Sequence, residues 1–200
     1  MPSFEDEESD LLDNLGQIFL RALARKDRGD VDEAEELLRD IIRKEPRLGE
    51  PHLELARLLL DTDRVSDAED HAREAIQHLE GTGVWIDEPP ENVILGLAHA
   101  TLAESLRRRA DEEDVIFGDP AQFHAIVNEA RQHFQRANEL DPSDEYASYH
   151  AFFLGIPGKG ARVAIDGEVI DGEIVEDEDV DDEPLEDDPL LPGAPEPAEA

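Results

Sequence analysis

The chain has 200 residues, 39% of them hydrophobic, which suffices for one helical domain and leaves little room for a second. Its formal net charge of -35, from 53 acidic residues against 18 Lys and Arg, opposes binding to nucleic acid and to anionic lipid. The absence of cysteine excludes disulfides, thiolate nucleophiles and Cys-ligated zinc. The acidic start lacks the basic head and apolar run of a secretory signal, so we expect a cytoplasmic protein that contacts no membrane.

The first part of the chain predicts an acidic extension over 1–8, followed by two amphipathic helices. Ser9 is a candidate cap for the first helix. Its apolar residues recur at helical spacing: Leu11, Leu12, Leu15, Ile18, Phe19, Ala22 and Leu23. Gly29 is expected to end this helix. Asp30 stands three residues before Glu33, which predicts a capping box at the start of the second helix.

The same pair of helices then recurs. Pro51 can open a third helix, and Ser66 with Glu69 predicts a capping box for a fourth. Residues 29–34 (Gly-Asp-Val-Asp-Glu-Ala) and 63–68 (Asp-Arg-Val-Ser-Asp-Ala) align with an offset of 68 − 34 = 34 residues, the period of tetratricopeptide arrays. The chain therefore resembles the tetratricopeptide-repeat (TPR) family. This resemblance implies an all-α fold, a right-handed superhelical array of antiparallel helix pairs (an α-α solenoid).

The resemblance predicts one TPR-like helical domain over 9–154. Its expected parts are repeat 1 at about 14–47, repeat 2 at about 48–81, repeat 3 at about 91–142 and a C-terminal capping helix at about 143–154. Repeat 3 is longer than the period allows, which predicts an insertion over 107–120 with a turn at Gly118 and a helix start at Asp119. Trp85, the single Trp, is expected to fill a seam between repeats.

Residues 155–200 form an acidic tail rich in Pro and Gly, which we expect to be disordered. Positions 161–200 alone hold 16 acidic residues and one basic residue, Arg162. Within the tail, the segment from Ile165 to Val175 repeats itself every five residues with Asp-Gly turn signals. This pattern is compatible with a hairpin and with a short linear binding motif.

No pattern in the sequence predicts catalysis or a cofactor. The seven histidines lack metal-ligand spacing, and no phosphate-binding loop or nucleophile motif is present. Arg107, Arg108 and Arg109 form the one basic cluster, and helical spacing lets them pair with the acidic residues at 111–114. We therefore expect a protein that is not an enzyme, with no metal, no cofactor and no nucleic-acid partner.

The function implied by the resemblance is that of a cytoplasmic scaffold or adaptor for protein binding. By analogy with the family, nine positions would line the concave partner groove: Phe19, Leu23, Lys26, Leu53, Arg57, Leu60, Leu95, His99 and Leu102. The expected partner is a protein with an apolar or amphipathic, basic segment, and self-association stays open. The alternative is that the acidic tail acts as a polyelectrolyte that chaperones or masks a basic protein, with the repeats as a dimerising or targeting base.

Overall fold

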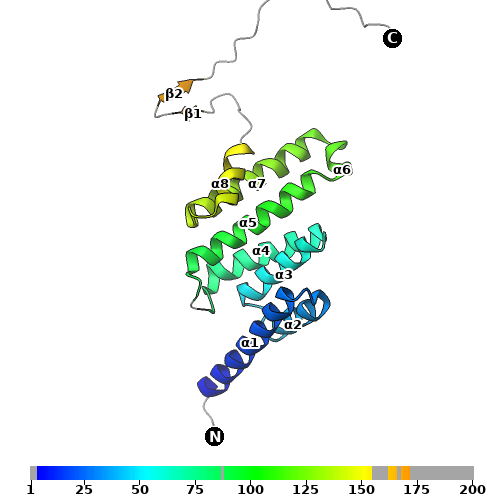
Figure 1. Cartoon of the computed structure of the whole chain (residues 1–200), viewed down its shortest axis with the longest axis vertical. Helices are drawn as coiled ribbons and strands as arrows, with labels where there is room; N and C mark the ends of the chain where they lie inside the picture. The colour runs from blue at the N-terminus through cyan, green and yellow to red at the C-terminus, as the bar shows by residue number, and fades with distance from the viewer. Residues whose placement is uncertain (1–3, 87, 155–161, 166–167, 172–200) are drawn as a thin grey trace, which may run out of the picture. The chain divides into compact units, whose positions relative to one another are not determined.

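The structure, a computed structural model, describes residues 4–86, 88–154, 162–165 and 168–171 (Figure 1). Its helices are α1 (Phe4–Asp27), α2 (Val31–Lys44), α3 (Gly49–Asp61), α4 (Val65–Thr82), α5 (Glu91–Ala110), α6 (Glu113–Ile116), α7 (Pro120–Leu140) and α8 (Glu145–Phe153). Two short strands follow, β1 (Arg162–Ile165) and β2 (Glu168–Asp171). The chain divides into two compact units, Met1–Ile156 and Pro157–Ala200.

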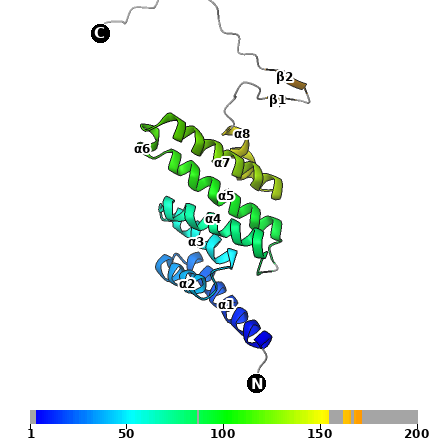
Figure 2. The same cartoon turned by 180° about the vertical axis from the view of Figure 1, so that it is seen from behind.

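The helices of the first unit pack in chain order. Each helix from α1 to α4 contacts the helix that follows it in the chain. Beyond these, α5 contacts α7, and α7 contacts α8. The front and back views agree on this succession from α1 in blue to α8 in yellow (Figures 1 and 2). The predicted all-α array of helix pairs is therefore confirmed, whereas its right-handed superhelical path stays a prediction.

The turns of the first two helix pairs share one geometry. Gly29 (φ 82°) and Asp63 (φ 61°) both lie in the left-handed region, and they stand 63 − 29 = 34 residues apart. In each turn the next amide donates to the carbonyl five residues before it, at 3.0 Å from Asp30 and 2.9 Å from Arg64. This bond closes the helix end. Asp tolerates the left-handed conformation, so the second turn keeps its shape without glycine.

The helix starts correct two of the predicted caps. Asp30 precedes α2 without a side-chain cap bond, because its carboxylate accepts from Arg25 Nη1 at 3.1 Å instead. α4 begins one residue before Ser66, which therefore lies inside the helix and is not its cap. The third prediction is confirmed: Asp119 accepts from the amide of Ala121 at 2.9 Å, and proline opens α7.

α1 begins at Phe4, five residues before Ser9, so most of the predicted extension over 1–8 is helical and Ser9 does not cap it.

Small residues allow α3 and α4 to approach each other closely. The fully buried alanines of α1 to α4 are Ala22, Ala34, Ala56, Ala68, Ala72 and Ala75. At the start of α3, a Cβ on Gly49 would lie 2.6 Å from Leu79 Cγ and 3.1 Å from the Ala75 carbonyl oxygen. Any larger residue at position 49 would force these two helices apart.

A buried carboxylate holds the loop between α4 and α5. Glu50 is 2% exposed, and its Oε1 accepts from the backbone amides of Trp85 and of Ile86, the latter at 3.2 Å. The Trp85 ring packs against Phe19 of α1, with ring centroids 5.7 Å apart. Trp85 thus fills a seam between helices of different pairs, as predicted.

The third helix pair consists of two long helices, α5 and α7, joined by the short helix α6. The insertion over 107–120 predicts the turn before α7, whereas the separate helix α6 was not predicted. Val115 of α6 is buried and fixes the connection to the core. A Cβ on Gly118 would lie 2.3 Å from the backbone oxygen of Asp114, so the turn into α7 requires glycine.

In the second unit, β1 and β2 pair as an antiparallel hairpin, with Val163 opposite Ile170 and Ala164 opposite Val169. Of the two interpretations open for the repeated Asp-Gly pattern, these residues adopt the hairpin. The disorder predicted for 155–200 otherwise concerns residues 155–161, 166–167 and 172–200, which lie outside the described residues.

Candidate protein-interaction site

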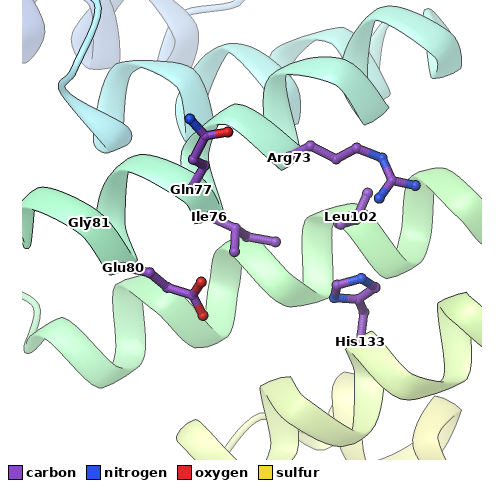
Figure 3. A pocket seen from close by; sticks show the side chains of 7 residues that line it. All are labelled: Arg73, Ile76, Gln77, Glu80, Gly81, Leu102 and His133. Carbon is purple, nitrogen blue, oxygen red and sulfur yellow. The ribbon is translucent and has the colours of Figure 1, made fainter.

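A pocket of about 440 Å³ opens between α4, α5 and α7. We call it the α4–α5–α7 pocket, and its lining residues are Arg73, Ile76, Gln77, Glu80, Gly81, Leu102 and His133. Ile76 lies at its centre, Leu102 lies with Arg73 and His133 toward one end, and Glu80 lies toward the other end (Figure 3). The pocket therefore combines an apolar floor with a polar rim.

One face of α4 supplies most of the lining. Arg73, Ile76, Gln77 and Glu80 follow the spacing i, i+3, i+4 and i+7, which brings them onto one stripe of the helix. Ile76 is 9% exposed and belongs to the core cluster shared by α3, α4, α5 and α7. Because this floor is part of the core, it is held rigidly.

Arg73 on the rim is already engaged by two carboxylates. Its Nη2 lies 2.8 Å from Glu69 Oε1 and 2.7 Å from Glu129 Oε1, so it joins α4 to α7. Glu69 also pairs with Arg109 of α5 at 2.6 Å. The charge of Arg73 is thus neutralised, and the exposed carboxylate of Glu80 gives the rim a negative end.

His133 contributes an uncharged wall. Its Nδ1 lies 2.9 Å from Nδ1 of His99, and the two rings stack with centroids 5.1 Å apart. Burial and the neighbouring His133 lower the pKa of His99 to about 4. Burial also lowers the pKa of His133, against the opposing effect of Glu129. Both rings are therefore neutral at physiological pH, and one donates its Nδ1 hydrogen to the other.

An apolar floor with neutral walls suits an aliphatic or aromatic side chain better than a charged small molecule. Among the described residues, no group of three or more His, Cys, Asp or Glu is placed to bind a metal ion. Within the same residues, no helix combines the length and the apolar character needed to cross a membrane.

The structure places the nine predicted groove residues in two groups. Five are buried at 6% exposure or less, namely Phe19, Leu53, Leu60, His99 and Leu102. Neighbouring helices cover these five residues, and partner binding at their positions stays a prediction. The remaining four are half-buried: Leu23, Lys26, Arg57 and Leu95.

Two of the half-buried residues already have partners. Glu54 accepts from Lys26 Nζ at 2.7 Å and from Arg57 Nη1 at 2.6 Å, which ties α1 to α3. Of the nine predicted residues, Leu102 also lines the α4–α5–α7 pocket. Binding of a partner along the first helices of the repeats stays a prediction.

The basic cluster on α5 is neutralised, as predicted. Arg107 pairs with Asp111 at 3.1 Å. The stronger partner is Glu104, which accepts from both Arg107 at 2.8 Å and Arg108 at 2.7 Å. Sequence reasoning considered the acids after the cluster and missed the one before it.

Sequence reasoning also missed most of the pocket. Sequence patterns identified none of the four residues on this face of α4 as a site. The spacing of Arg73, Gln77 and Glu80 around Ile76 is the signal that was available. Nothing in the spacing connects this face with His133 of α7, because their proximity depends on how the helices stack.

Residues 26–82 match the family model described as Tetratricopeptide repeat. The match runs from the end of α1 through α4, the part of the chain with the 34-residue period. The resemblance to the tetratricopeptide-repeat family is therefore confirmed for this segment. Repeats of this family generally mediate protein–protein interaction, and they are typically non-enzymatic modules. No curated protein matches the sequence.

Proposed function

We propose that this protein is a non-catalytic scaffold whose α4–α5–α7 pocket receives an apolar side chain from an amphipathic, basic segment of a partner protein. The observation that carries this proposal is the apolar floor formed by Ile76 and Leu102 beneath an uncharged His133. A volume of about 440 Å³ accommodates one or two large side chains, so the pocket fits an anchor residue of a peptide or helix.

The surrounding charge favours a basic partner. The net charge of -35 attracts cationic segments over distances of about a Debye length, which raises the association rate. At the pocket itself, Arg73 is neutralised by Glu69 and Glu129, whereas Glu80 is exposed. A Lys or Arg beside the anchor residue would thus meet a carboxylate without competing with an unpaired arginine.

The test captures partners from native lysate with the immobilised full chain and with two pocket variants. Gly81→Trp places a large ring at the pocket rim, where a Cβ has no heavy atom within 4 Å, so the fold accommodates it. Glu80→Lys reverses the exposed charge. Glu36→Lys on α2 serves as the matched control, because Glu36 is exposed and lies outside the pocket.

We expect both pocket variants to lose the same captured protein by at least about tenfold, with Glu36→Lys and helical circular dichroism unchanged. Capture that survives both pocket variants would reject the pocket as the binding site. The same experiment with a chain that lacks residues 157–200 tests the alternative function. Loss of capture on truncation alone would assign binding to the acidic tail, which holds all 16 acidic residues of positions 161–200.

A further inference from the structure

The connection between α5 and α7 exposes two large apolar residues that are adjacent in the chain. Ile116, the last residue of α6, is 50% exposed, and Phe117 after it is 84% exposed. The preceding residue, Val115, is 5% exposed and already anchors α6 in the core. Folding of the tip is therefore served by Val115, and the apolar character of its two neighbours has no role in the packing of the chain.

Backbone bonds hold this tip in one conformation. The amides of Ile116 and Phe117 donate to the carbonyls of Glu112 and Glu113, each at 2.9 Å. The amide of Gly118 donates to the Val115 carbonyl at 3.3 Å. The Phe117 side chain thus projects from an ordered helical turn, and a partner that binds it has little backbone entropy to overcome.

The apolar pair is surrounded by negative charge. No Lys or Arg occurs between Arg109 and Arg131 in the sequence. The exposed acids of the tip are Asp111, Glu112, Glu113, Asp114 and Asp119. Two of them have local roles, since Asp111 pairs with Arg107 and Asp119 caps α7. Glu112, Glu113 and Asp114 form no ion pair within the described residues.

We propose that this acidic apolar tip, residues 111–119, is a second docking element that inserts Phe117 and Ile116 into an apolar socket bordered by Lys and Arg on a partner protein. The occupant follows from charge complementarity. A purely apolar socket would leave the three unpaired carboxylates without partners, whereas a basic border pairs with them and steers the encounter. An exposed aromatic ring among such charges is a typical anchor of an interface.

This proposal concerns a different surface from the pocket proposal. In the pocket proposal the partner inserts a side chain into this protein, whereas here this protein inserts Phe117 and Ile116 into the partner. The two proposals therefore fail separately. Loss of binding at the tip leaves the α4–α5–α7 pocket untouched, and the variants Gly81→Trp and Glu80→Lys leave the tip untouched.

The test uses a synthetic amphipathic helix with a leucine stripe flanked by lysines, labelled for fluorescence anisotropy and titrated with the full-length protein. A second peptide with the same lysines and serine in place of leucine measures binding through charge alone. One protein variant combines Ile116→Ser with Phe117→Ser. Another combines Glu113→Gln with Asp114→Asn, which removes charge and keeps shape.

Matched controls are Leu20→Ser, which removes an apolar side chain of 66% exposure on α1, and Asp32→Asn with Glu36→Gln, which removes two exposed charges on α2. We expect the apolar tip variant to weaken binding by about tenfold or more, and the charge variant to weaken it severalfold with a shallower salt dependence. The controls should retain the affinity of the natural chain, and any part of the affinity that is lost in the two pocket variants belongs to the α4–α5–α7 pocket and not to the tip.

Three outcomes would overturn the proposal. Equal affinity for the leucine and serine peptides would show attraction by charge alone. Unchanged affinity of the Ile116→Ser, Phe117→Ser variant would remove the tip from binding. Loss of affinity in Gly81→Trp without loss in the tip variants would place the peptide in the α4–α5–α7 pocket instead.

Discussion

The first two helix pairs and the α5–α7 unit use similar residues for their cores but present different surfaces. In the first two pairs the 34-residue spacing is kept, and α3 is covered along nearly its whole length, with Leu53, Leu55, Leu58, Leu59 and Leu60 all buried. In the α5–α7 unit the spacing is interrupted, and there the chain exposes Phe117 and borders a pocket with His133. The interruption thus adds an exposed apolar tip, whereas the pocket lies where the α4 face of the second helix pair meets α5 and α7.

The largest expected effect is a difference in the free energy of unfolding between substitutions at two phenylalanines near the α5–α7 pair. Phe134 is 0% exposed and lies between α5, α7 and α8, so Phe134→Ala should lower the free energy of unfolding by about 3–5 kcal/mol. Phe117→Ala, at 84% exposure, should change it by less than about 0.5 kcal/mol. Urea unfolding followed by circular dichroism measures both. A large decrease in the free energy of unfolding for Phe117→Ala would mean that the tip contributes to the stability of the fold.

The next prediction concerns stability and tests the close packing of α3 against α4 in the first two helix pairs. Gly49→Val places two methyl groups beyond a Cβ that already lies 2.6 Å from Leu79 Cγ, and it should destabilise the protein by about 2–3 kcal/mol. Gly81→Ala is the matched control near the end of α4, two residues after Leu79, where a Cβ meets no heavy atom within 4 Å. It should be neutral or stabilising by up to about 1 kcal/mol. Equal effects in thermal unfolding would contradict the proposed contact.

A smaller effect concerns the carboxylate that joins α5 to α8. Burial alone would raise the pKa of Glu104, but hydrogen bonds from Arg107, Tyr146 and Arg108 outweigh it and lower the pKa to about 2. Its stabilisation is fully present above the ordinary value of 4.5 and is lost as the pH falls toward 2. Glu104→Gln should cost about 1–3 kcal/mol at pH 7 and little at pH 2.

The control for this prediction is Tyr146→Phe, which removes one hydrogen bond of 2.6 Å to Glu104 and keeps the ring. We expect it to cost about 1 kcal/mol at pH 7. A destabilisation by Glu104→Gln that is equally large at both pH values would show that the charge of Glu104 contributes nothing.

The smallest expected effect shows a property that the two halves share. His52 in α3 lies 3.1 Å from His71, as His99 lies 2.9 Å from His133, and burial lowers the pKa of both His52 and His99 to about 4. The unfolded chain binds these protons near the ordinary value of 6.5, so stability should fall as the pH drops from about 6.5 to 4.

Replacing one histidine should reduce this acid sensitivity. In His99→Leu the loss of stability between pH 6.5 and pH 4 should be smaller than in the natural chain by about 1–2 kcal/mol. Leu20→Ala, which changes an exposed side chain of α1 that binds no proton, should leave the pH dependence unchanged. Urea titrations at several pH values decide between the two, and parallel curves for all three proteins would exclude the histidine pair as the cause.

The sequence was a good guide wherever structure depends on near neighbours. Ala34 and Ala68 recur with the repeat period, and the turn at Gly29 recurs at Asp63, because each turn and helix contact is formed within one repeat. The same locality explains why Asp119 was recognised as a cap. Three other predicted caps are wrong, because α1 begins before Ser9, Arg25 competes for Asp30, and α4 begins before Ser66.

Sequence reasoning was a poor guide to the candidate site because the site depends on stacking between repeats. The distance from Ile76 to His133 depends on the packing of α4, α5 and α7, which no local pattern encodes. Likewise, the burial of Leu53 and Leu102, which are 3% and 1% exposed, follows from the helices stacked around them. Exposure is a property of the assembled array, so residue type and register alone overestimate the apolar surface.

Because Glu50 binds the backbone of the Trp85 loop, the fluorescence of Trp85 can report on the structure around it. Trp85 is the chain's single tryptophan, and its ring packs on Phe19 of α1, while both tyrosines lie in α8 at the other end of the array. Tryptophan emission therefore reports on the docking of α1, and tyrosine emission reports on α8. Fraying of one end of the array can thus be distinguished from fraying of the other in a single unlabelled sample.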